Sequence, residues 1–559
     1  MGGATEWDRE TDLLVCGAGA GGMATALIAA LNGLQVVIAE KTGQVGGTTA
    51  TSGGTVWVPG NALSDDSAAD AEAFLHHVVG DRGGDDLRGA FLASARAAFA
   101  EFQDRTEVQF AAAAAHPDYL DGPGAAYGGR AMGPLAFDGR RLGADFTRIR
   151  PPRPEFMGLG GMMAGRTEID ALLNPFSSLA NFRQGTGIVL RYLIDRLRHP
   201  RGTRLLMGNA LVARLLFSLH QQGVPVIYNA PLADLIHDGD RVAGAVLNTP
   251  DGPLRVRARR GVVLATGGVA WNPAIRAALF PAGTRDLSLA PDTNTGDGAD
   301  RAQAVGARID AGGDSPALWM PVSSYRRADG HLAVWPHILL DRAKPGLLAV
   351  NAQGQRFVNE SDSYHDFCMG QIAQGAFPAW LICDDAFIRR YGLGLVLPGG
   401  HGLRRLQKAG YVVSAADLAG LAAAIGVDAG GLAETVAAYN SAAVTGDDPM
   451  GRGSSVMNRF NGDAGVGPNP CLRAIGPGPF HAVQVRPADL ASSAGIVTDI
   501  HGQVQGDQST IFGLYAVGND AASIFRGTYP GPGTTLGPAL VFGWRVARHA
   551  AGLPTPDHL

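Results

Sequence analysis

Three glycines near the start of the chain have the spacing of a dinucleotide-binding turn. Gly17, Gly19 and Gly22 form a G-x-G-x-x-G pattern. The first glycine allows a tight turn, the second lets backbone approach a pyrophosphate, and the third lets a helix pack closely on a strand. The chemistry that this spacing predicts is the binding of phosphate groups at the N-terminus of a helix.

The elements that must position these glycines lie on both sides of them. Residues 13–16 are an apolar run typical of a buried parallel strand, and residues 23–31 are an Ala- and Leu-rich stretch typical of a helix. Residues 35–39 predict a second strand. Glu40 ends it about twenty residues after the glycines, where an acid accepts hydrogen bonds from a ribose. A tight turn without a ligand is the alternative, but the strand–helix–strand–acid order favours nucleotide binding.

Later stretches of small residues predict more backbone contacts to the same ligand. Residues 46–49 and 52–54 follow the acid, and small residues in such density let backbone lie against a flat ligand. A buried strand ends in the glycine pair at 267–268, and a C-terminal apolar run, 513–519, ends in Gly-Asn. Both ends of the chain are therefore expected in one nucleotide-binding domain.

The order of elements predicts an α/β fold with two units. We expect a Rossmann-like domain that is split between residues 1–290 and residues 479–559. Residues 291–478 mix strands and helices and predict an inserted α+β catalytic or capping domain. Apolar residues at helix spacing predict a helical insertion at about residues 158–222 of the first part.

Composition excludes several classes of protein. With 46 basic and 51 acidic residues the net charge is -5, so no nucleic-acid partner is expected. The cysteines, Cys16, Cys368, Cys383 and Cys471, form no C-x-x-C pair, which predicts neither a disulfide framework nor a metal site. The N-terminus lacks the apolar core of a signal peptide, and no apolar run reaches about eighteen residues. We expect a cytoplasmic protein, with peripheral membrane contact left open.

The order of the motifs resembles the fumarate reductase/succinate dehydrogenase flavoprotein superfamily. The pieces that carry this resemblance are residues 17–22, 46–49, 265–268, Asn359-Glu360 and Gly518-Asn519. The tail at 529–539, Tyr-Pro-Gly-Pro-Gly-x-x-x-Gly-Pro-Ala, resembles the 3-ketosteroid Δ1-dehydrogenase branch. The resemblance implies bound FAD and a catalytic domain that caps its isoalloxazine. Covalent members carry a histidine near the Gly-Gly-Thr loop, and none lies at 41–61, so non-covalent FAD is expected.

The resemblance also assigns the cofactor contacts. The residues expected to bind FAD are Gly17, Gly19, Ala20, Gly22, Glu40, Lys41, Gly46, Gly47, Thr48, Thr49, Ser52, Gly53, Gly54, Thr266, Gly267, Gly268, Gly518, Asn519, Thr535 and Leu536.

The reaction that the resemblance implies is 1,2-dehydrogenation beside a ring ketone, such as C1–C2 of a 3-ketosteroid. Loss of the α-proton develops negative charge on the ketone oxygen, and a hydride leaves the neighbouring carbon for flavin N5. The Tyr529 hydroxyl and the Gly533 N–H match the family's donors to that oxygen. Tyr364 matches its base, although a free phenol, with a pKa near ~10, needs help in that role. Tyr119 matches the tyrosine that supports the base, and Tyr127 is a rival for that position.

The sequence leaves partners and alternatives open. The expected partners are a 3-ketosteroid or related cyclic ketone and an external electron acceptor such as a quinone. A Δ4-type steroid dehydrogenase or a dehydrogenase of another cyclic ketone is an alternative. A fumarate- or enoate-type reductase is disfavoured because no His-Pro pair follows residues 295–298. An electron-transfer subunit is disfavoured because cysteine clusters and haem motifs are missing.

The chain departs from the family's pattern at two places. Residues 486–495 lack one glycine of the family's usual pair, and the segment 158–222 is longer than its counterpart in the compact steroid enzymes.

Overall fold

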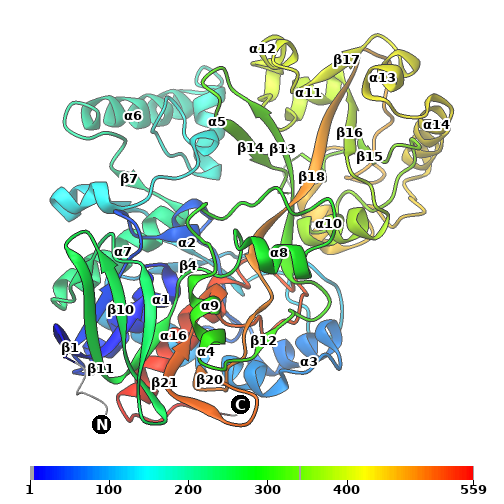
Figure 1. The fold of residues 1–559 in the computed structure, drawn as a ribbon. Helices are drawn as coiled ribbons and strands as arrows, with labels where there is room; N and C mark the ends of the chain where they lie inside the picture. Colours follow the sequence, from blue (N-terminus) through cyan, green and yellow to red (C-terminus); the bar gives the residue numbers. More distant parts are fainter. Residues whose placement is uncertain (1–5, 339–340, 558–559) are drawn as a thin grey trace.

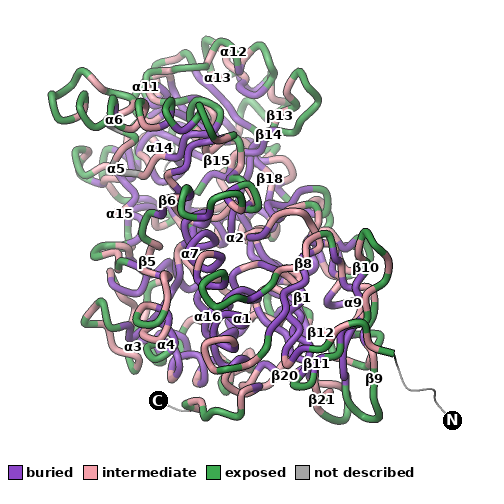
Figure 2. Tube along the Cα trace, turned by 90° about the vertical axis from the view of Figure 1, so that its left-hand side faces the viewer, coloured by how far each residue is buried: buried purple, intermediate pink, exposed green. Residues whose placement is uncertain are grey.

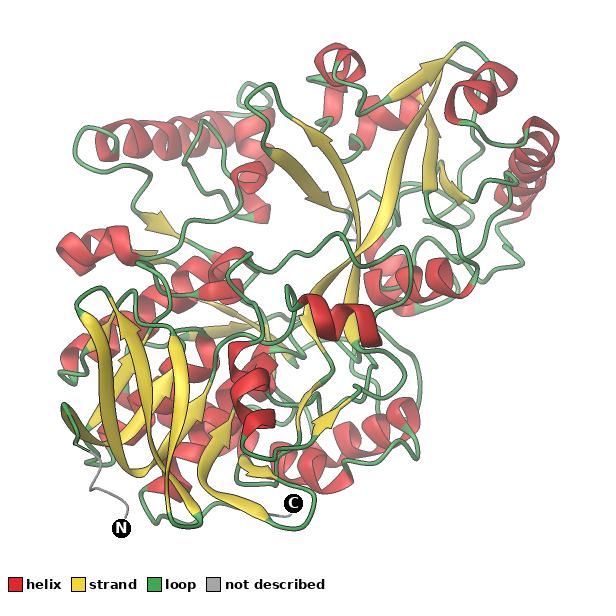
Figure 3. Cartoon of the chain, viewed as in Figure 1, coloured by secondary structure: helices red, strands yellow, loops and turns green. Residues whose placement is uncertain are grey.

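The computed structural model describes residues 6–338 and 341–557. Within these residues an eight-stranded sheet and a six-stranded sheet form the centres of two lobes, lower and upper in Figure 1. Figure 3 shows helices beside both sheets. This mixture of elements confirms the α/β class expected from the sequence.

The larger sheet is built on β1 (Arg9–Cys16), which lies between β2 (Val36–Ala39) and β11 (Gly252–Leu264). All three strands run parallel, and residues 13–15 of β1 are fully buried, as in a strand covered on both faces. β21 (Thr510–Ala516) pairs in parallel with β11, so a strand from the C-terminal part shares this sheet. The remaining strands are β8 (Val226–Ile227), β9 (Leu232–Asp238), β10 (Arg241–Thr249) and β20 (Gln503–Gln505).

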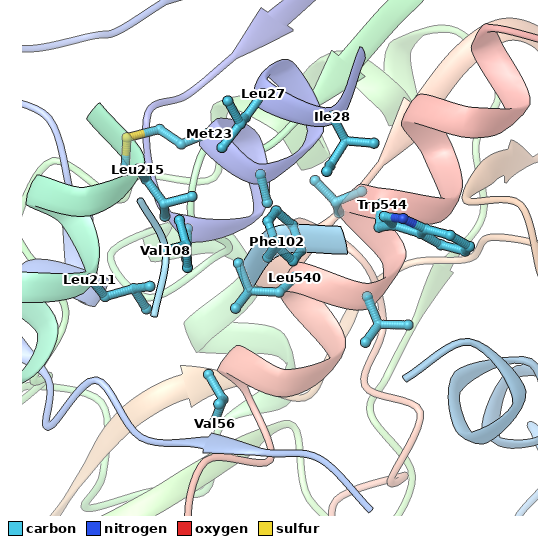
Figure 4. Close-up of a cluster of buried hydrophobic side chains, with 14 of the residues drawn as sticks. Met23, Leu27, Ile28, Val56, Phe102, Val108, Leu211, Leu215, Leu540 and Trp544 are labelled. Atoms are coloured by element: carbon cyan, nitrogen blue, oxygen red, sulfur yellow. The ribbon is translucent and has the colours of Figure 1, made fainter. Parts of the chain in front are cut away.

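Three helices, α1 (Ala20–Leu31), α7 (Met207–Gln221) and α16 (Leu536–Ala550), share one apolar core with a face of this sheet. Alternate strand residues such as Leu13 and Val15 join that core, while Leu14 and Cys16 pack on the opposite face. Figure 4 shows part of the core, with Met23, Leu27, Ile28, Leu211, Leu215, Leu540 and Trp544 among its members. Helices from both ends of the chain thus hold the N-terminal strand–helix unit in place.

The helical stretch that begins near residue 70 is two helices, α3 (Ala68–Val79) and α4 (Asp85–Arg105). The chain turns between them at Gly80, Gly83 and Gly84, whose φ angles are 60°, 78° and 80°. Such positive φ values favour glycine and interrupt a helix. The glycines between the two helices therefore set their ends.

The helical insertion is shorter than expected. α5 (Arg166–Leu173) and α6 (Leu179–Asp195) pack on each other at the upper left of Figure 1. α7 instead belongs to the core of the larger lobe, so the insertion ends before it and not near residue 222. Exposed apolar side chains of the insertion are Leu173, Phe176, Leu179, Phe182, Leu190, Leu193, Ile194 and Leu197, and Figure 2 shows much of this region as exposed. No helix in the described part of the chain has the length and apolar character needed to span a membrane.

The smaller sheet is centred on β18 (Phe480–Ser492), which pairs antiparallel with β13 (Ala317–Arg326) and β16 (Ala379–Asp384). The chain was expected to return to the nucleotide domain at residue 479. Since β18 is hydrogen-bonded to the second lobe on both sides, that return comes only after Ser492. An apolar strand pattern identifies a strand but not the sheet that it joins.

The other elements of the second lobe are β14 (Leu332–Pro336), β15 (Leu347–Val350), β17 (Val413–Ala415), α10 (Tyr364–Ala373), α11 (Asp385–Tyr391), α12 (Leu403–Lys408), α13 (Leu418–Ile425), α14 (Ala429–Thr445) and α15 (Val456–Asn461). Short elements elsewhere are α2 (Gly47–Thr51), β3 (Val56–Trp57), β4 (Phe110–Ala112), β5 (Ala131–Pro134), β6 (Phe137–Asp138), β7 (Arg204–Leu205), α8 (Pro273–Leu279), α9 (Asp297–Ala304), β12 (Ile309–Asp310) and β19 (Gly495–Ile496).

A buried ion cluster fixes the strap that leads into α10. Glu360 is fully buried and lies 2.7 Å from the Arg356 guanidinium and 2.9 Å from that of Arg452. It also accepts a hydrogen bond from the Ala349 N–H of β15 at 3.0 Å. Burial by itself would raise the pKa of Glu360, but the two arginines lower it to about 2. The next turn, capped by Ser363, starts α10, so this cluster positions the first residue of that helix.

We predict that Glu360→Gln lowers the free energy of unfolding by about 3–5 kcal/mol, because it leaves two buried guanidinium groups without a carboxylate. The native pKa lies below the unfolded one, so the contribution of this carboxylate is present above pH 4.5 and is lost as pH falls towards 2. Urea unfolding at pH 7 and pH 4 measures both effects. Arg389→Gln, which breaks an exposed pair with Asp385, should change stability by less than about 1 kcal/mol. Equal losses in the two variants would contradict this account.

Candidate active site

A cavity of about 430 Å³ lies between the glycine turn of the first lobe and the sheet of the second. From the first lobe it is lined by residues 16–22, 39–41, 47–49 and 51–55, together with segments near 265–267, 517–519 and 532–536. From the second lobe it is lined by Met320, Pro336 and Tyr364, among others. The cavity therefore joins nearly every motif that the sequence singled out.

The three glycines of the turn have different structural roles. Gly17 has a φ of 115°, and a Cβ there would lie 2.0 Å from the Ala265 oxygen. A Cβ at Gly22 would lie 2.1 Å from the Gly17 oxygen, so no side chain fits where α1 packs on the turn. A Cβ at Gly19 would meet nothing within 4 Å, and Gly19 lines the cavity. Two glycines are thus needed by the fold, while Gly19 keeps backbone accessible to a ligand.

Glu40 lies at the end of β2, beside the glycine turn. Its carboxylate accepts hydrogen bonds from the Ala18 N–H at 3.0 Å and the Thr42 N–H at 2.9 Å. Lys41 also lines the cavity, but Asp297 at the start of α9 lies 2.9 Å from its ammonium. The acid is therefore held rigidly where a ribose is expected, and the lysine is held by an ion pair.

The Gly-Gly-Thr loop forms the short helix α2. Ala20 donates a hydrogen bond to the Thr49 hydroxyl at 3.2 Å, which ties this loop to the start of α1. All of the expected loop residues line the cavity except Gly46, whose backbone packs on Ala50 and Val212. Gly268 also lies outside the lining, because it packs against Ser492 and Asn519. These two glycines make turns and do not face the cavity.

Asp520 fixes the second glycine pair. Its buried carboxylate accepts hydrogen bonds from the N–H groups of Thr266 at 2.5 Å and Gly268 at 2.8 Å. Burial raises the pKa of Asp520 to about 6 in spite of these donors. The residue thereby joins the 266–268 turn to the C-terminal Gly518-Asn519 turn, two segments that both line the cavity.

The donor set suits a flat cofactor with a pyrophosphate. The N-terminal ends of two helices, α1 and α16, lie at the cavity through Ala20 and Thr535-Leu536. Helix N-termini favour negative charge because their first N–H groups have no intrahelical acceptor. With the open Gly19 and the acid at the end of β2, these groups fit the phosphate and ribose portions of FAD.

Three buried tyrosines form one cluster at the cavity. The ring centroid of Tyr364 lies 5.4 Å from that of Tyr119 and 5.1 Å from that of Tyr529, and the rings of Tyr119 and Tyr529 stack at 5.7 Å. Tyr364 meets both other rings edge-on, so the three phenols lie at one place in the cavity. Tyr127 is 59% exposed and does not line the cavity. Of the two tyrosines that the sequence left open, Tyr119 is the one beside Tyr364.

The electrostatics of the cluster follow from its burial. Burial, together with Tyr119 and Tyr529, raises the pKa of Tyr364 well above its ordinary value. Burial also raises the pKa of Tyr119 and that of Tyr529. All three phenols are therefore neutral at pH 7, and each has a proton to donate.

The Gly533 N–H lies on the loop that begins at Tyr529. In the described chain this N–H has no acceptor, while the Gly533 carbonyl accepts a hydrogen bond from the Trp57 N–H of β3 at 3.1 Å. Gly533 has a φ of 97°, and a Cβ there would lie 2.6 Å from the Thr55 oxygen. The peptide is thus fixed against β3, and it lines the same cavity as the tyrosines.

The remaining walls are mainly apolar. They include Phe156, Leu289, Met320, Pro336, Ile338 and Leu490. Two arginines, Arg150 and Arg153, also line the cavity, and no motif in the sequence marked them. One end of the cavity therefore presents backbone N–H groups, and the other presents phenols, apolar side chains and a guanidinium.

Comparison with known proteins identifies the family of the chain. The FAD binding domain family matches residues 12–536 of the chain. A 4-oxocyclohex-2-ene-1-carboxylate 5-dehydrogenase of Sinomonas cyclohexanicum is 38% identical over 97% of this chain and 94% of its own. A 3-oxosteroid 1-dehydrogenase of Mycobacterium tuberculosis H37Rv is 34% identical over 97% of this chain and 98% of its own. The crystal structure of 3-ketosteroid delta1-dehydrogenase from Sterolibacterium denitrificans with 1,4-androstadiene-3,17-dione has a TM-score of 0.89 at 34% identity, covering 97% of this chain and 100% of that one. These matches confirm the resemblance that the motifs predicted.

We predict that Gly19→Val folds but does not retain FAD, since its side chain meets only the cavity. Gly22→Val should instead lower the melting temperature by several degrees, because its Cβ has no room against Gly17. The ratio of flavin to protein absorbance after purification and the melting temperature of the apoprotein separate the two effects. A Gly19→Val protein as yellow as wild type would show that the pyrophosphate lies elsewhere.

Proposed function

The chain belongs to the FAD-binding family of flavoprotein oxidoreductases, and on this premise we propose that it desaturates a cyclic ketone between the α-carbon, next to the carbonyl, and the adjoining β-carbon. The observation that carries the proposal is the cluster of Tyr119, Tyr364 and Tyr529 in the cavity that also contains the Gly533 N–H. When bound, FAD accepts the hydride of this reaction. The protein supplies the groups that bind the ketone and move the proton.

Tyr529 and Gly533 hold the ketone oxygen in this proposal. Negative charge develops on that oxygen as the α-proton leaves, and two fixed donors stabilise it. The phenol of Tyr529 is neutral and buried, and the Gly533 N–H has no acceptor in the described chain, so both donors are available. Because the Gly533 peptide is fixed against β3, the pair does not need to reorganise as the charge develops.

Tyr364 takes the α-proton, and Tyr119 supports it. The Tyr119 ring, whose centroid lies 5.4 Å from that of Tyr364, is close enough for its phenol to orient the Tyr364 oxygen and to give the proton a route away from the substrate. The α-carbon thus loses a proton to Tyr364, the β-carbon loses a hydride, and the two electrons left on the α-carbon form the new carbon–carbon double bond. Burial keeps Tyr364 protonated at pH 7 and only its phenolate can take a proton, so the chemical step should depend steeply on pH.

The relatives support two kinds of ring ketone as the substrate. The steroid relatives support a 3-ketosteroid, which would gain a C1–C2 double bond. The 38% identical relative supports a smaller ring that carries a carboxylate. Oxidation of both kinds by the FAD-loaded protein, with a dye as electron acceptor and product analysis, tests the proposal. Failure to form an α,β-unsaturated ketone from any of them would refute it.

The proposal includes an external electron acceptor such as a quinone, since the reduced cofactor must be reoxidised before the next turnover.

The proposal also includes peripheral contact with a membrane. Support for that contact comes from the exposed apolar side chains of α6 and from the exposed Arg183, Arg196 and Arg198 in and after the same helix. Apolar and basic side chains on one helix suit the surface of an anionic bilayer.

We predict that Tyr529→Phe keeps its FAD and loses roughly 100- to 1,000-fold in turnover, the usual cost of one donor to a developing oxyanion. Tyr127→Phe is the matched control, because that exposed tyrosine does not line the cavity. Flavin content and the rate of flavin reduction by the best ketone measure the two quantities. A wild-type rate in Tyr529→Phe would remove this residue from the oxyanion site.

We predict that kcat/KM rises with pH up to pH 10 without levelling off. A base acts only when deprotonated, and burial raises the pKa of Tyr364 well above 10.0, so the active fraction grows about tenfold per pH unit. Stopped-flow reduction of the bound flavin across this range gives the profile, and Tyr364→Phe should lose the rise. A plateau near neutral pH in the wild type would assign proton removal to another group.

A further inference from the structure

Arg153 places a positive charge in the apolar part of the cavity. It lies just before the short helical turn Pro154–Phe156, and Phe156 lines the same wall. The Arg153 guanidinium donates a hydrogen bond from Nη2 to the Leu289 carbonyl at 2.5 Å. Leu289 belongs to the apolar cluster that contains Tyr119, Tyr364 and Tyr529. The guanidinium is thus anchored to the wall that carries the tyrosines.

No carboxylate in the described chain forms an ion pair with Arg153, although the charge of Glu155 acts on it. Glu155, two residues away, pairs with Arg327 at 2.5 Å. The acidic residues of the cavity lining are Glu40 and Asp297, and both are engaged at the cofactor end. Burial lowers the pKa of Arg153 although the nearby Glu155 raises it, because the guanidinium is largely removed from water.

Arg150 has a different environment, although it is close in sequence. Its backbone is hydrogen-bonded to Val45 and to Asn209, next to the Gly-Gly-Thr loop, and its Nε has no partner in the described chain. That position is at the cofactor end of the cavity. The two arginines of the lining therefore lie at different places, with Arg150 beside the Gly-Gly-Thr loop and Arg153 at the wall that carries the tyrosines.

We infer that Arg153 binds a carboxylate on the substrate, so that the preferred substrate is a cyclic keto acid and not a neutral ketone. This inference rests on the proposed function. A planar guanidinium donates two parallel hydrogen bonds to a carboxylate, and such a pair is strong where water is excluded. With the ketone oxygen at Tyr529 and Gly533 and the carboxylate at Arg153, the ring is held at two points. Two-point binding fixes which carbons face the base.

The test compares 4-oxocyclohexane-1-carboxylate with its methyl ester, which has the same ring without the charge. The FAD-loaded wild type should oxidise the acid with a kcat/KM about 100-fold above that of the ester. Arg153→Met should lower kcat/KM for the acid by a similar factor and leave that for the ester within about threefold, and Arg153→Lys should restore part of the loss. Arg148→Met, an exposed arginine outside the cavity lining, is the control and should match the wild type.

A second readout does not depend on turnover. Cyclohexanecarboxylate lacks the ketone, and its binding should perturb the flavin absorbance of the wild type but not that of Arg153→Met, whereas cyclohexanecarboxamide should bind neither protein. An equal preference for acid and ester in the wild type, or an Arg153→Met variant that weakens both alike, would overturn the inference. If no ketone is oxidised but cyclohexanecarboxylate still binds through Arg153, the proposed function fails and the anion site stands.

Discussion

The contact among three buried phenols is the constraint on which the site depends. Tyr119 comes from the first lobe, Tyr364 begins a helix of the second, and Tyr529 lies on the C-terminal loop. Their rings lie within 5.1–5.7 Å of one another only when all three segments are docked. Packing of the lobes and assembly of the proton-transfer groups are therefore one event. The same burial excludes water from the groups that must stabilise an oxyanion, and it raises the pKa of each phenol.

Close packing of backbone holds the C-terminal loop that brings Tyr529 to this cluster. A Cβ at Gly531 would lie 2.6 Å from Trp57 Nε1, and one at Gly537 would lie 2.2 Å from the Trp57 oxygen. Trp57 is itself fixed by a 2.8 Å hydrogen bond from its indole to Asp118, which pairs with Arg130 at 2.7 Å. The glycines of the tail let the loop lie directly on β3. That fit leaves the Gly533 N–H pointing in a direction set by the sheet, as a preorganised donor requires.

The sequence predicted the parts of the site that depend on local backbone. Gly17, Gly19 and Gly22 are recognisable because turn, ligand approach and helix packing each exclude a side chain in a fixed order. The fold class followed for the same reason, since strand and helix periods are local. The tail beginning at Tyr529 was recognisable because its prolines and glycines are unusual together.

The sequence could not predict features that depend on contacts between distant segments. The sequence matched Tyr119 to the supporting tyrosine but kept Tyr127 as a rival. The docking of the Tyr529 loop distinguishes them, because its Pro530 carbonyl accepts a hydrogen bond from the Tyr119 N–H at 2.8 Å. β18 has the pattern of any buried strand, so its place in the second sheet was missed. Arg153 belongs to no motif, because its significance comes from its place in the cavity wall and from the lack of an ion pair to it in the described chain.

The residues proposed for the reaction and the residue proposed for substrate choice thus lie in different kinds of segment. The tyrosines and the glycine turn are held by core packing, and a change there disturbs the fold as well as the reaction. Arg153 lies between the core strand pairing at Val45 and the exposed α5–α6 insertion, and a single hydrogen bond to Leu289 anchors its side chain. A residue at such a position can change without moving the three phenols or the glycine turn. The desaturation chemistry is thus compatible with neutral and anionic ring ketones, and side chains of the cavity wall such as Arg153 decide between them.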